Sequence, residues 1–289
     1  MPFLEQTLPH IVRQHSCEFE SKTLIIDDLP LKDGSFPDDQ PCWNIFSDFC
    51  AALEKHGIFT SRMYLSRVST DARIIRKHFR RVPGYVRDYR GVPLCGWIAG
   101  LECATSTFHV HFDSDVFVYQ APGFDWIAEG MALLRQESEI LFVAPHPGPP
   151  RRDGVLLDQT EHHCAGPSSN FRFTTFSSRR FLVERRRFES LLPLPLTIAS
   201  RRIWLQSLFA KRSPLETWES LVSRRMSEAG LYRAHLNTRS AWALHAPDHG
   251  SDFIQLLPFL IRSVERGWCP SEQAGRYDLN LGIWKEHAQ

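Results

Sequence analysis

The sequence predicts an α/β protein, because short apolar runs typical of strands alternate with longer segments of helical periodicity. Residues 107–112 (Thr-Phe-His-Val-His-Phe) alternate and are rich in β-formers, so we expect a strand there. Residues 125–136 repeat apolar side chains at helical spacing behind Asp125, a residue that often caps a helix. A run of prolines and glycine at 145–150 is the clearest internal boundary.

The elements before that boundary follow from the same two periodicities. Pro9 strains the first helix, and Gly57 ends the second, as a glycine after the last turn often does. In chain order we expect helix 3–15, strand 21–26, helix 43–56, strand 58–66, helix 71–79, helix 96–104, strand 107–112, helix 125–136 and strand 139–144.

The part after the boundary is less regular. We expect helices at 202–211, 214–229 and 253–265. The basic, aromatic segment 171–187 is expected to form a β-hairpin with an exposed basic face; the alternative is a surface for an anionic or lipid-linked acceptor. We therefore divide the chain into residues 1–150 and residues 151–289, as two halves of one domain.

Composition excludes several classes of protein. The 289 residues carry 34 Lys+Arg against 33 Asp+Glu, a balance that excludes both a strongly basic nucleic-acid binder and an acidic disordered chain. The longest apolar runs, such as residues 140–144, are far too short to span a bilayer, although contact with a membrane surface stays open. The seven cysteines include no Cys-x-x-Cys pair, which favours free thiols and a cytoplasmic location.

The sharpest chemical feature is the pair of acids in Asp113-Ser114-Asp115, directly after the predicted strand 107–112. Two carboxylates one residue apart can reach the same hard cation, such as Mn²⁺ or Mg²⁺, whose other positions are filled by water or phosphate. Ligands also bind preferentially where strands of an open α/β sheet end. The alternative interpretation is a solvated turn with two acids.

Two further groups have features of a nucleotide site. Asp27 and Asp28 end the strand 21–26 and can accept hydrogen bonds from a nucleobase or a ribose; an Asx turn before Pro30 is the alternative. Arg87 and Arg90 can neutralise a diphosphate, and Gly91 would let the backbone approach it. A surface arginine pair beside a loop glycine is equally compatible with this segment.

The remaining candidates lie in the second half. Glu216 and Glu219 lie near the predicted start of helix 214–229, where a carboxylate either caps the helix or acts as a general base. His245 is a candidate metal or phosphate ligand, against the alternative of a core or rim histidine. His162-His163-Cys164 lacks a second pair at zinc-finger spacing, so we do not predict zinc there.

Taken in order, these segments resemble the GT-A glycosyltransferases, and among them glycosyltransferase family 2. Ile26-Asp27-Asp28 is similar to the family's first acid pair, and Phe112-Asp113-Ser114-Asp115 to its Asp-x-Asp motif. Glu216-Thr217-Trp218-Glu219-Ser220-Leu221 is similar to its acid-Trp-acid helix, and the resemblance covers roughly residues 3–245. Thr217 replaces the family's usual Asp, and the chain begins where the first helix is expected, so the first nucleotide-binding strand is missing from the match.

The resemblance implies a GT-A (nucleotide-diphospho-sugar transferase) fold, a Rossmann-like three-layer sandwich with a mixed sheet. It implies metal-dependent, inverting transfer of a sugar from a nucleotide diphosphate donor to a glycan, lipid-linked or small-molecule acceptor. By this resemblance, Asp113, Asp115 and His245 would hold Mn²⁺ or Mg²⁺, and Ser114 would lie at the cofactor. The nucleotide would be bound by Asp27, Asp28, Arg87, Arg90 and Gly91. Glu216 or Glu219 would act as the base.

Two other functions stay open. In haloacid-dehalogenase-like phosphatases the first Asp of an Asp-x-Asp motif is a nucleophile, a role that would fall to Asp113. Phe117 stands where that motif has Thr or Val, and the motif normally lies near the start of the chain. The other possibility is a degenerate transferase that binds a glycan or a protein without catalysis.

Overall fold

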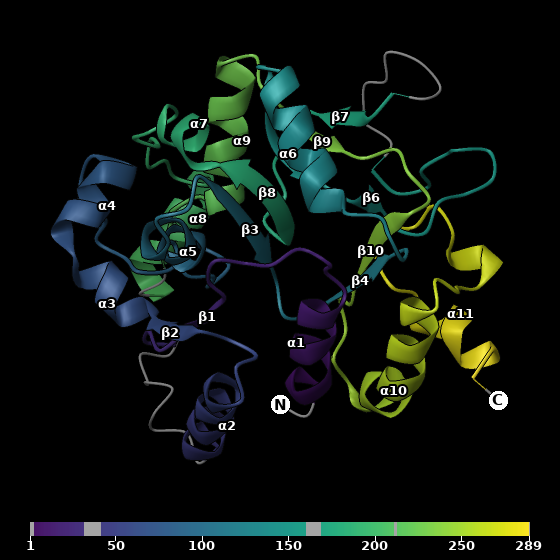
Figure 1. The fold of residues 1–289 in the computed structure, drawn as a ribbon. Helices are drawn as coiled ribbons and strands as arrows, with labels where there is room; N and C mark the ends of the chain where they lie inside the picture. Colours follow the sequence, from purple (N-terminus) through teal and green to yellow (C-terminus); the bar gives the residue numbers. More distant parts are fainter. Residues whose placement is uncertain (1–2, 32–41, 160–168, 211–212, 289) are drawn as a thin grey trace. The chain divides into compact units, whose positions relative to one another are not determined.

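The computed structural model describes residues 3–31, 42–159, 169–210 and 213–288 and shows an α/β protein with mixed sheets (Figure 1). The chain forms two compact units. Unit 1 comprises Met1–Glu18, Val110–Glu184 and Leu231–Gln289, and unit 2 comprises Phe19–His109 and Arg185–Gly230. Each unit therefore contains segments from both sides of the Pro/Gly run at 145–150.

A five-stranded mixed sheet is the framework of unit 1. Its order is β3-β8-β5-β9-β7, with β5 parallel to β9 and antiparallel to β8. The strands are β3 Phe108–Phe112, β5 Ile140–Ala144, β7 Phe171–Phe173, β8 Arg180–Glu184 and β9 Tyr232–His235. Every residue of β5 is buried, which explains its continuous apolar run.

Helix α6 (Trp126–Gln136) packs against this sheet. It begins where the sequence predicts, because the carboxylate of Asp125 accepts from the amides of Ile127 and Ala128. A Cβ atom added at Gly130 would lie 2.7 Å from Cδ2 of Leu182, so the helix approaches β8 through its glycine.

The second sheet of unit 1 has the order β4-β10-β6, formed by Val116–Gln120, Ala241–His245 and His146–Pro147. β10 is antiparallel to β4 and parallel to β6. Helices α1 (Leu4–Arg13) and α10 (Ser251–Glu265) lie against β4, and α11 (Leu281–Glu286) contacts α10. Their core includes Phe117, Trp242, Phe253, Leu257 and Trp284, all almost fully buried.

Among its described residues, unit 2 contains the parallel pair of β1 (Thr23–Ile26) with β2 (Ser61–Tyr64). Its α-helices are α2 Trp43–Lys55, α3 Leu65–Thr70, α4 Ala72–Phe79, α5 Gly96–Cys103, α7 Arg185–Glu189, α8 Arg201–Ala210 and α9 Trp218–Glu228. Trp218 of α9 is buried, stacks on Trp97 of α5 at 5.2 Å between ring centroids and also contacts Phe188 of α7. These aromatic contacts hold three helices together.

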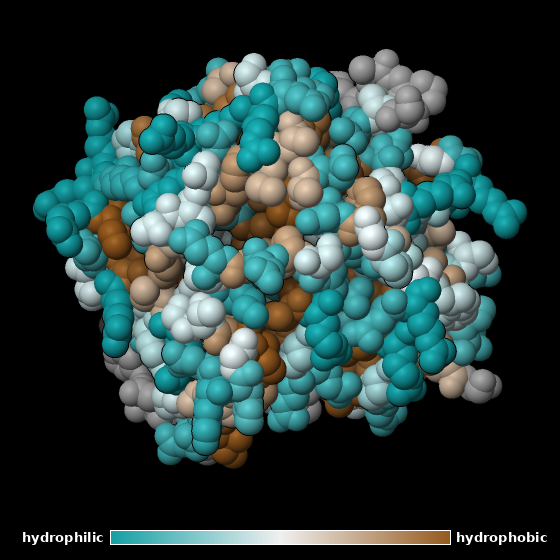
Figure 2. All heavy atoms as spheres, viewed as in Figure 1, coloured by the Kyte–Doolittle hydropathy of each residue, from teal (hydrophilic) through white to brown (hydrophobic). Residues whose placement is uncertain are grey.

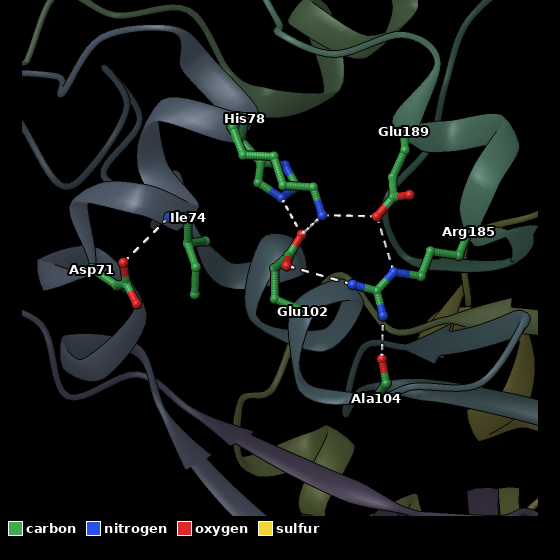
Figure 3. Close-up of polar contacts among 8 residues, drawn as sticks. Asp71, Ile74, His78, Glu102, Ala104, Arg185 and Glu189 are labelled. Atoms are coloured by element: carbon green, nitrogen blue, oxygen red, sulfur yellow. Dashed lines mark hydrogen bonds and ion pairs between the residues drawn. The ribbon is translucent and has the colours of Figure 1, made fainter.

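A network of charged side chains joins α4, α5 and α7 of unit 2 (Figure 3). Nζ of Lys77 lies 2.7 Å from Oε1 of Glu102 and 2.7 Å from Oε1 of Glu189. Nε2 of the buried His78 also lies 2.7 Å from Oε1 of Glu102. Arg185 donates to Glu189 and to the carbonyl of Ala104. Each carboxylate therefore has at least two cationic or ring-nitrogen neighbours, which compensates its partial burial.

Most of the predicted helices and strands are confirmed, with shifts of one to a few residues at their ends. The largest shift is at α9, which begins at Trp218 and not at residue 214, because Thr217 is its cap and accepts from the amide of Ser220. One prediction is wrong. Segment 171–187 is no hairpin: β7 pairs with β9, β8 pairs with β5, and Arg180 is fully buried.

Hydrophilic side chains predominate on the face drawn in Figure 2, with hydrophobic ones in scattered groups between them. Among the residues described above, no helix combines the length and apolar character that crossing a bilayer requires. Cys17, Cys42, Cys50, Cys95, Cys103 and Cys269 are free thiols, as expected, whereas Cys164 and the neighbouring histidine pair lie outside the described residues.

Candidate functional site

The turn between β3 and β4 carries Asp113, Ser114 and Asp115 in unit 1. β3 ends at Phe112 and β4 begins at Val116, so these three residues connect the two sheets. The amide of Asp113 donates to the carbonyl of Arg179 over 2.7 Å, which fixes the turn beside the start of β8. The sequence prediction that the Asp-x-Asp pair follows a strand is confirmed.

Asp115 is the buried member of the pair. Its side chain is 19% exposed, and its Oδ1 atom accepts no hydrogen bond from any residue in the described ranges. Burial, reinforced by the charge of Asp113, raises the pKa of Asp115 in spite of two nearby histidines. A carboxylate in this setting is stabilised by any positive charge that reaches it.

Two histidines face the other oxygen of Asp115. The register between β10 and β4 pairs His245 with Val116, next to Asp115 in the chain. Nε2 of His245 lies 3.7 Å from Oδ2 of Asp115, and Nε2 of His249 lies 3.3 Å from the same atom. His249 also stacks on Phe3 of unit 1, with ring centroids 4.7 Å apart.

A third acid orients His245. The short parallel bridge between His245 and Asp278 places Nδ1 of the ring 2.8 Å from Oδ1 of Asp278. Arg179 donates to the same oxygen over 2.8 Å. Burial by itself would raise the pKa of Asp278, but the hydrogen bond to His245 and the charge of Arg179 lower it below its usual value. Asp278 is thus an ionised acceptor.

Asp113 has a different environment. Its Oδ1 atom lies 3.0 Å from Nε2 of His111, whose ring stacks on Phe181 of β8 with centroids 5.1 Å apart. The Asp113 side chain is about one-third exposed, and Ser114 between the acids is also partly exposed. Asp113 is therefore the more accessible of the two carboxylates.

The donor atoms fit a divalent cation in their chemistry. Asp115 offers a buried oxygen without a hydrogen bond, and Asp113, His245 and His249 offer oxygen and imidazole nitrogen nearby. Within the described part of the chain, however, no three His, Cys, Asp or Glu side chains are arranged so that all could hold one metal ion.

The predicted nucleotide residues lie together in unit 2. Arg87 forms a bidentate pair with Asp27, at 2.9 Å and 3.0 Å, although the two residues are far apart in sequence. Its other N–H groups donate to the carbonyls of Leu29, Pro30 and Gly91. All five donors of this guanidinium are thus engaged, so a phosphate would have to displace an existing acceptor.

Asp28 is hydrogen-bonded to Ser66 of α3. One of its oxygens accepts from the amide of Ser66 over 2.8 Å, and the other accepts from the hydroxyl of the same residue. These bonds tie the end of β1 to the first turn of α3. Of the two acids, only Asp27 makes the contact of the Asx turn that was the alternative prediction, because its Oδ1 atom accepts from the amide of Leu29 over 3.1 Å.

Arg90 is exposed and is the more available of the two arginines. It donates from Nε to the hydroxyl of Tyr89, and this bond, with the charges of Asp88 and Glu219, raises the pKa of Arg90. Glu219 lies in the first turn of α9, while Glu216 precedes the helix. The amide of Tyr89 donates to the carbonyl of Leu215, which joins the loop of Arg90 to this segment.

Sequence reasoning missed His249, Asp278 and Arg179. His249 follows His245 by only four residues and precedes the predicted helix 253–265, so a second ring nitrogen near β10 was a usable signal. Asp278 and Arg179 reach the site through backbone bridges to distant segments. No pattern along the chain indicates those bridges.

Compared with known protein families and with curated proteins, the chain matches no family model and no curated sequence.

Proposed function

We propose that the protein is a metal-dependent glycosyltransferase that moves a sugar from a nucleotide diphosphate donor to an acceptor. The observation that carries the proposal is Asp115: a largely buried carboxylate, one oxygen of which has no hydrogen bond, after a strand that ends in Asp-x-Asp. The resemblance to family 2 of the GT-A glycosyltransferases supports the same function from the order of the motifs.

The proposed roles follow from the environments described above. Asp115 and Asp113 would hold Mn²⁺ or Mg²⁺, with His245 as a further ligand kept in one tautomer by Asp278. When bound, such an ion supplies positive charge to the oxygens of the departing diphosphate. Arg90 is the arginine with capacity to bind phosphate, while Arg87 and Asp27 shape the loop beside it.

The general base is proposed among the acids near the start of α9. Glu219 lies in the first turn and interacts electrostatically with Arg90, and Glu216 precedes the cap Thr217. Either carboxylate would take the proton of the acceptor hydroxyl as it attacks the anomeric carbon, with inversion. Glu216→Gln and Glu219→Gln distinguish the two candidates. The variant that has lost the base should bind the donor but no longer transfer the sugar.

Calorimetric titration with uridine and guanosine diphosphate, with and without Mn²⁺, tests the proposal. We expect binding that depends on Mn²⁺, and we expect Asp115→Asn to weaken it by more than the roughly 10–100-fold that loss of an outer partner causes. The matched control is Asp252→Asn, a surface acid of α10 that pairs with Lys285. Absence of nucleotide binding by the unaltered protein, or equal binding by Asp115→Asn, would contradict the proposal.

A second measurement distinguishes the alternative enzyme. Incubation with a panel of nucleotide sugars should release nucleotide diphosphate slowly by hydrolysis, which Asp115→Asn removes. If Asp113 were the nucleophile of a phosphatase, a phosphate ester would instead leave an acid-stable aspartyl phosphate on the protein. Detection of that adduct by mass spectrometry would replace the transferase proposal.

A further inference from the structure

Helix α8 (Arg201–Ala210) in unit 2 exposes its apolar side chains. Trp204, Leu205, Leu208 and Phe209 are 44%, 52%, 60% and 89% exposed. Between Arg201 and Phe209, the buried side chain is the small, polar Ser207. An ordinary surface helix shows the opposite distribution, with apolar residues toward the core. The exposed side chains therefore call for a partner outside the chain.

The four side chains form one continuous face. Trp204 and Leu208 are four residues apart, as are Leu205 and Phe209, so the two pairs lie side by side along the helix. Arg201 precedes Leu205 by one turn on the same face, and Arg202 is its exposed neighbour. Ile198, just before the helix, is also 49% exposed.

We propose that α8 docks the protein on an anionic lipid surface. Trp, Phe and Leu side chains enter the acyl boundary when a helix lies in the membrane interface. Long arginine side chains such as Arg201 and Arg202 can reach the headgroups from there. The ten residues of α8 include two arginines and no acid, which complements anionic headgroups. This inference is independent of the proposed glycosyl transfer and concerns a surface that plays no part in it.

The dimensions of the helix favour a membrane over a second copy of the chain. Ten helical residues extend over about 15 Å with a diameter of about 10 Å. A stable interface between two proteins buries roughly 800 Å² on each partner, which exceeds what one face of this short helix offers. Interfacial docking needs only that the four apolar side chains enter the acyl boundary.

Sedimentation with sucrose-loaded vesicles tests the proposal on the full chain. We expect the protein to bind vesicles of phosphatidylcholine mixed with phosphatidylglycerol, and to bind pure phosphatidylcholine more weakly. The double variant Leu208→Glu and Phe209→Glu should lose at least about tenfold in apparent affinity, since both side chains would leave the acyl region. Arg201→Ala with Arg202→Ala should reduce the dependence on phosphatidylglycerol.

The matched control is Ile45→Glu, which alters an isoleucine of α2 that is 74% exposed in the same unit. It should bind vesicles as the unaltered protein does, and circular dichroism should show all variants folded. Failure of the unaltered protein to bind anionic vesicles, or equal binding by the Leu208/Phe209 variant, overturns the proposal. It is also overturned if sedimentation velocity shows an oligomer that only this variant dissociates while vesicle binding is absent.

Discussion

The ring nitrogen Nδ1 of His245 lies 2.8 Å from Oδ1 of Asp278, and the same oxygen accepts from Arg179. An ionised carboxylate only accepts, so the pair places the imidazole proton on Nδ1. When the ring is neutral, its lone pair is then on Nε2, which lies 3.7 Å from Oδ2 of Asp115. Imidazole ligands of metal ions are commonly held in this way by an outer carboxylate.

Replacement of Asp278 tests that arrangement. Asp278→Ala should weaken Mn²⁺-dependent binding of a nucleotide diphosphate by roughly 10–100-fold, because His245 loses the acceptor that fixes its tautomer and orientation. Calorimetric titration measures the change, with Asp252→Ala of α10 as the control. Binding unchanged from that of the control would show that Asp278 has no positioning role.

The network around Glu102 predicts a pH dependence of stability (Figure 3). Burial alone would raise the pKa of Glu102, but hydrogen bonds from His78 and Lys77 outweigh it and lower the pKa from 4.5 to about 2. A carboxyl group with a lowered pKa in the folded state stabilises the protein at pH values above its pKa in the unfolded state. This contribution of Glu102 therefore disappears as the pH falls from about 4.5 to about 2.

Glu102→Gln should therefore cost roughly 3 kcal/mol of unfolding free energy at neutral pH, and the difference from the unaltered protein should shrink toward pH 2. Urea unfolding at a series of pH values measures it. Glu286→Gln, an exposed residue of α11, is the control. A cost independent of pH over this range would mean that Glu102 stabilises the fold by packing and not by its charge.

The two predicted arginines should respond differently to replacement by lysine. Arg87→Lys leaves three donors for five acceptors and breaks the bidentate pair with Asp27, which should destabilise the protein by roughly 2–4 kcal/mol. Arg90→Lys should change stability by less than about 1 kcal/mol, because that side chain is exposed. Denaturant unfolding of both variants compares them, and equal losses would refute this division of roles.

Two helical glycines offer an opposite pair of outcomes. Gly130→Ala forces a Cβ to within 2.7 Å of the buried Leu182 and should lower stability by about 1 kcal/mol. Gly100→Ala in α5 meets no atom within 4 Å and should raise stability by up to about 1 kcal/mol through helix propensity. Thermal unfolding measures both, and the same sign for the two variants would contradict the packing of α6.

Local periodicity was enough to predict the elements that begin with a cap or bury one face. Asp125 caps α6 and Asp71 caps α4, Gly57 follows α2, and the apolar run of β5 forms a buried strand. Each signal acts within a few residues of the element it specifies. Asp27 and Arg87 were each proposed as nucleotide-binding residues, and no local signal indicated that they pair with each other, as the structure shows.

Elements defined by distant pairing were not predictable in the same way. Residues 171–187 have the composition of a hairpin, yet β7 and β8 each pair with a strand from elsewhere in the chain. Asp278 lies beside His245 only because the backbone at Tyr277 and Leu279 hydrogen-bonds to β10. Sequence spacing carries no information about such register, which is set by the packing of the whole sheet.

The interleaved strands of unit 1 have a consequence for its synthesis. β10 lies between β4 and β6, and β9 lies between β5 and β7. β9 and β10 therefore each insert between two strands that were synthesised earlier. Contacts of such long range slow folding and leave strand edges open until the later strand emerges. The two sheets are therefore incomplete until β9 and β10 have been made, and His245 reaches Asp115 only when β10 pairs with β4.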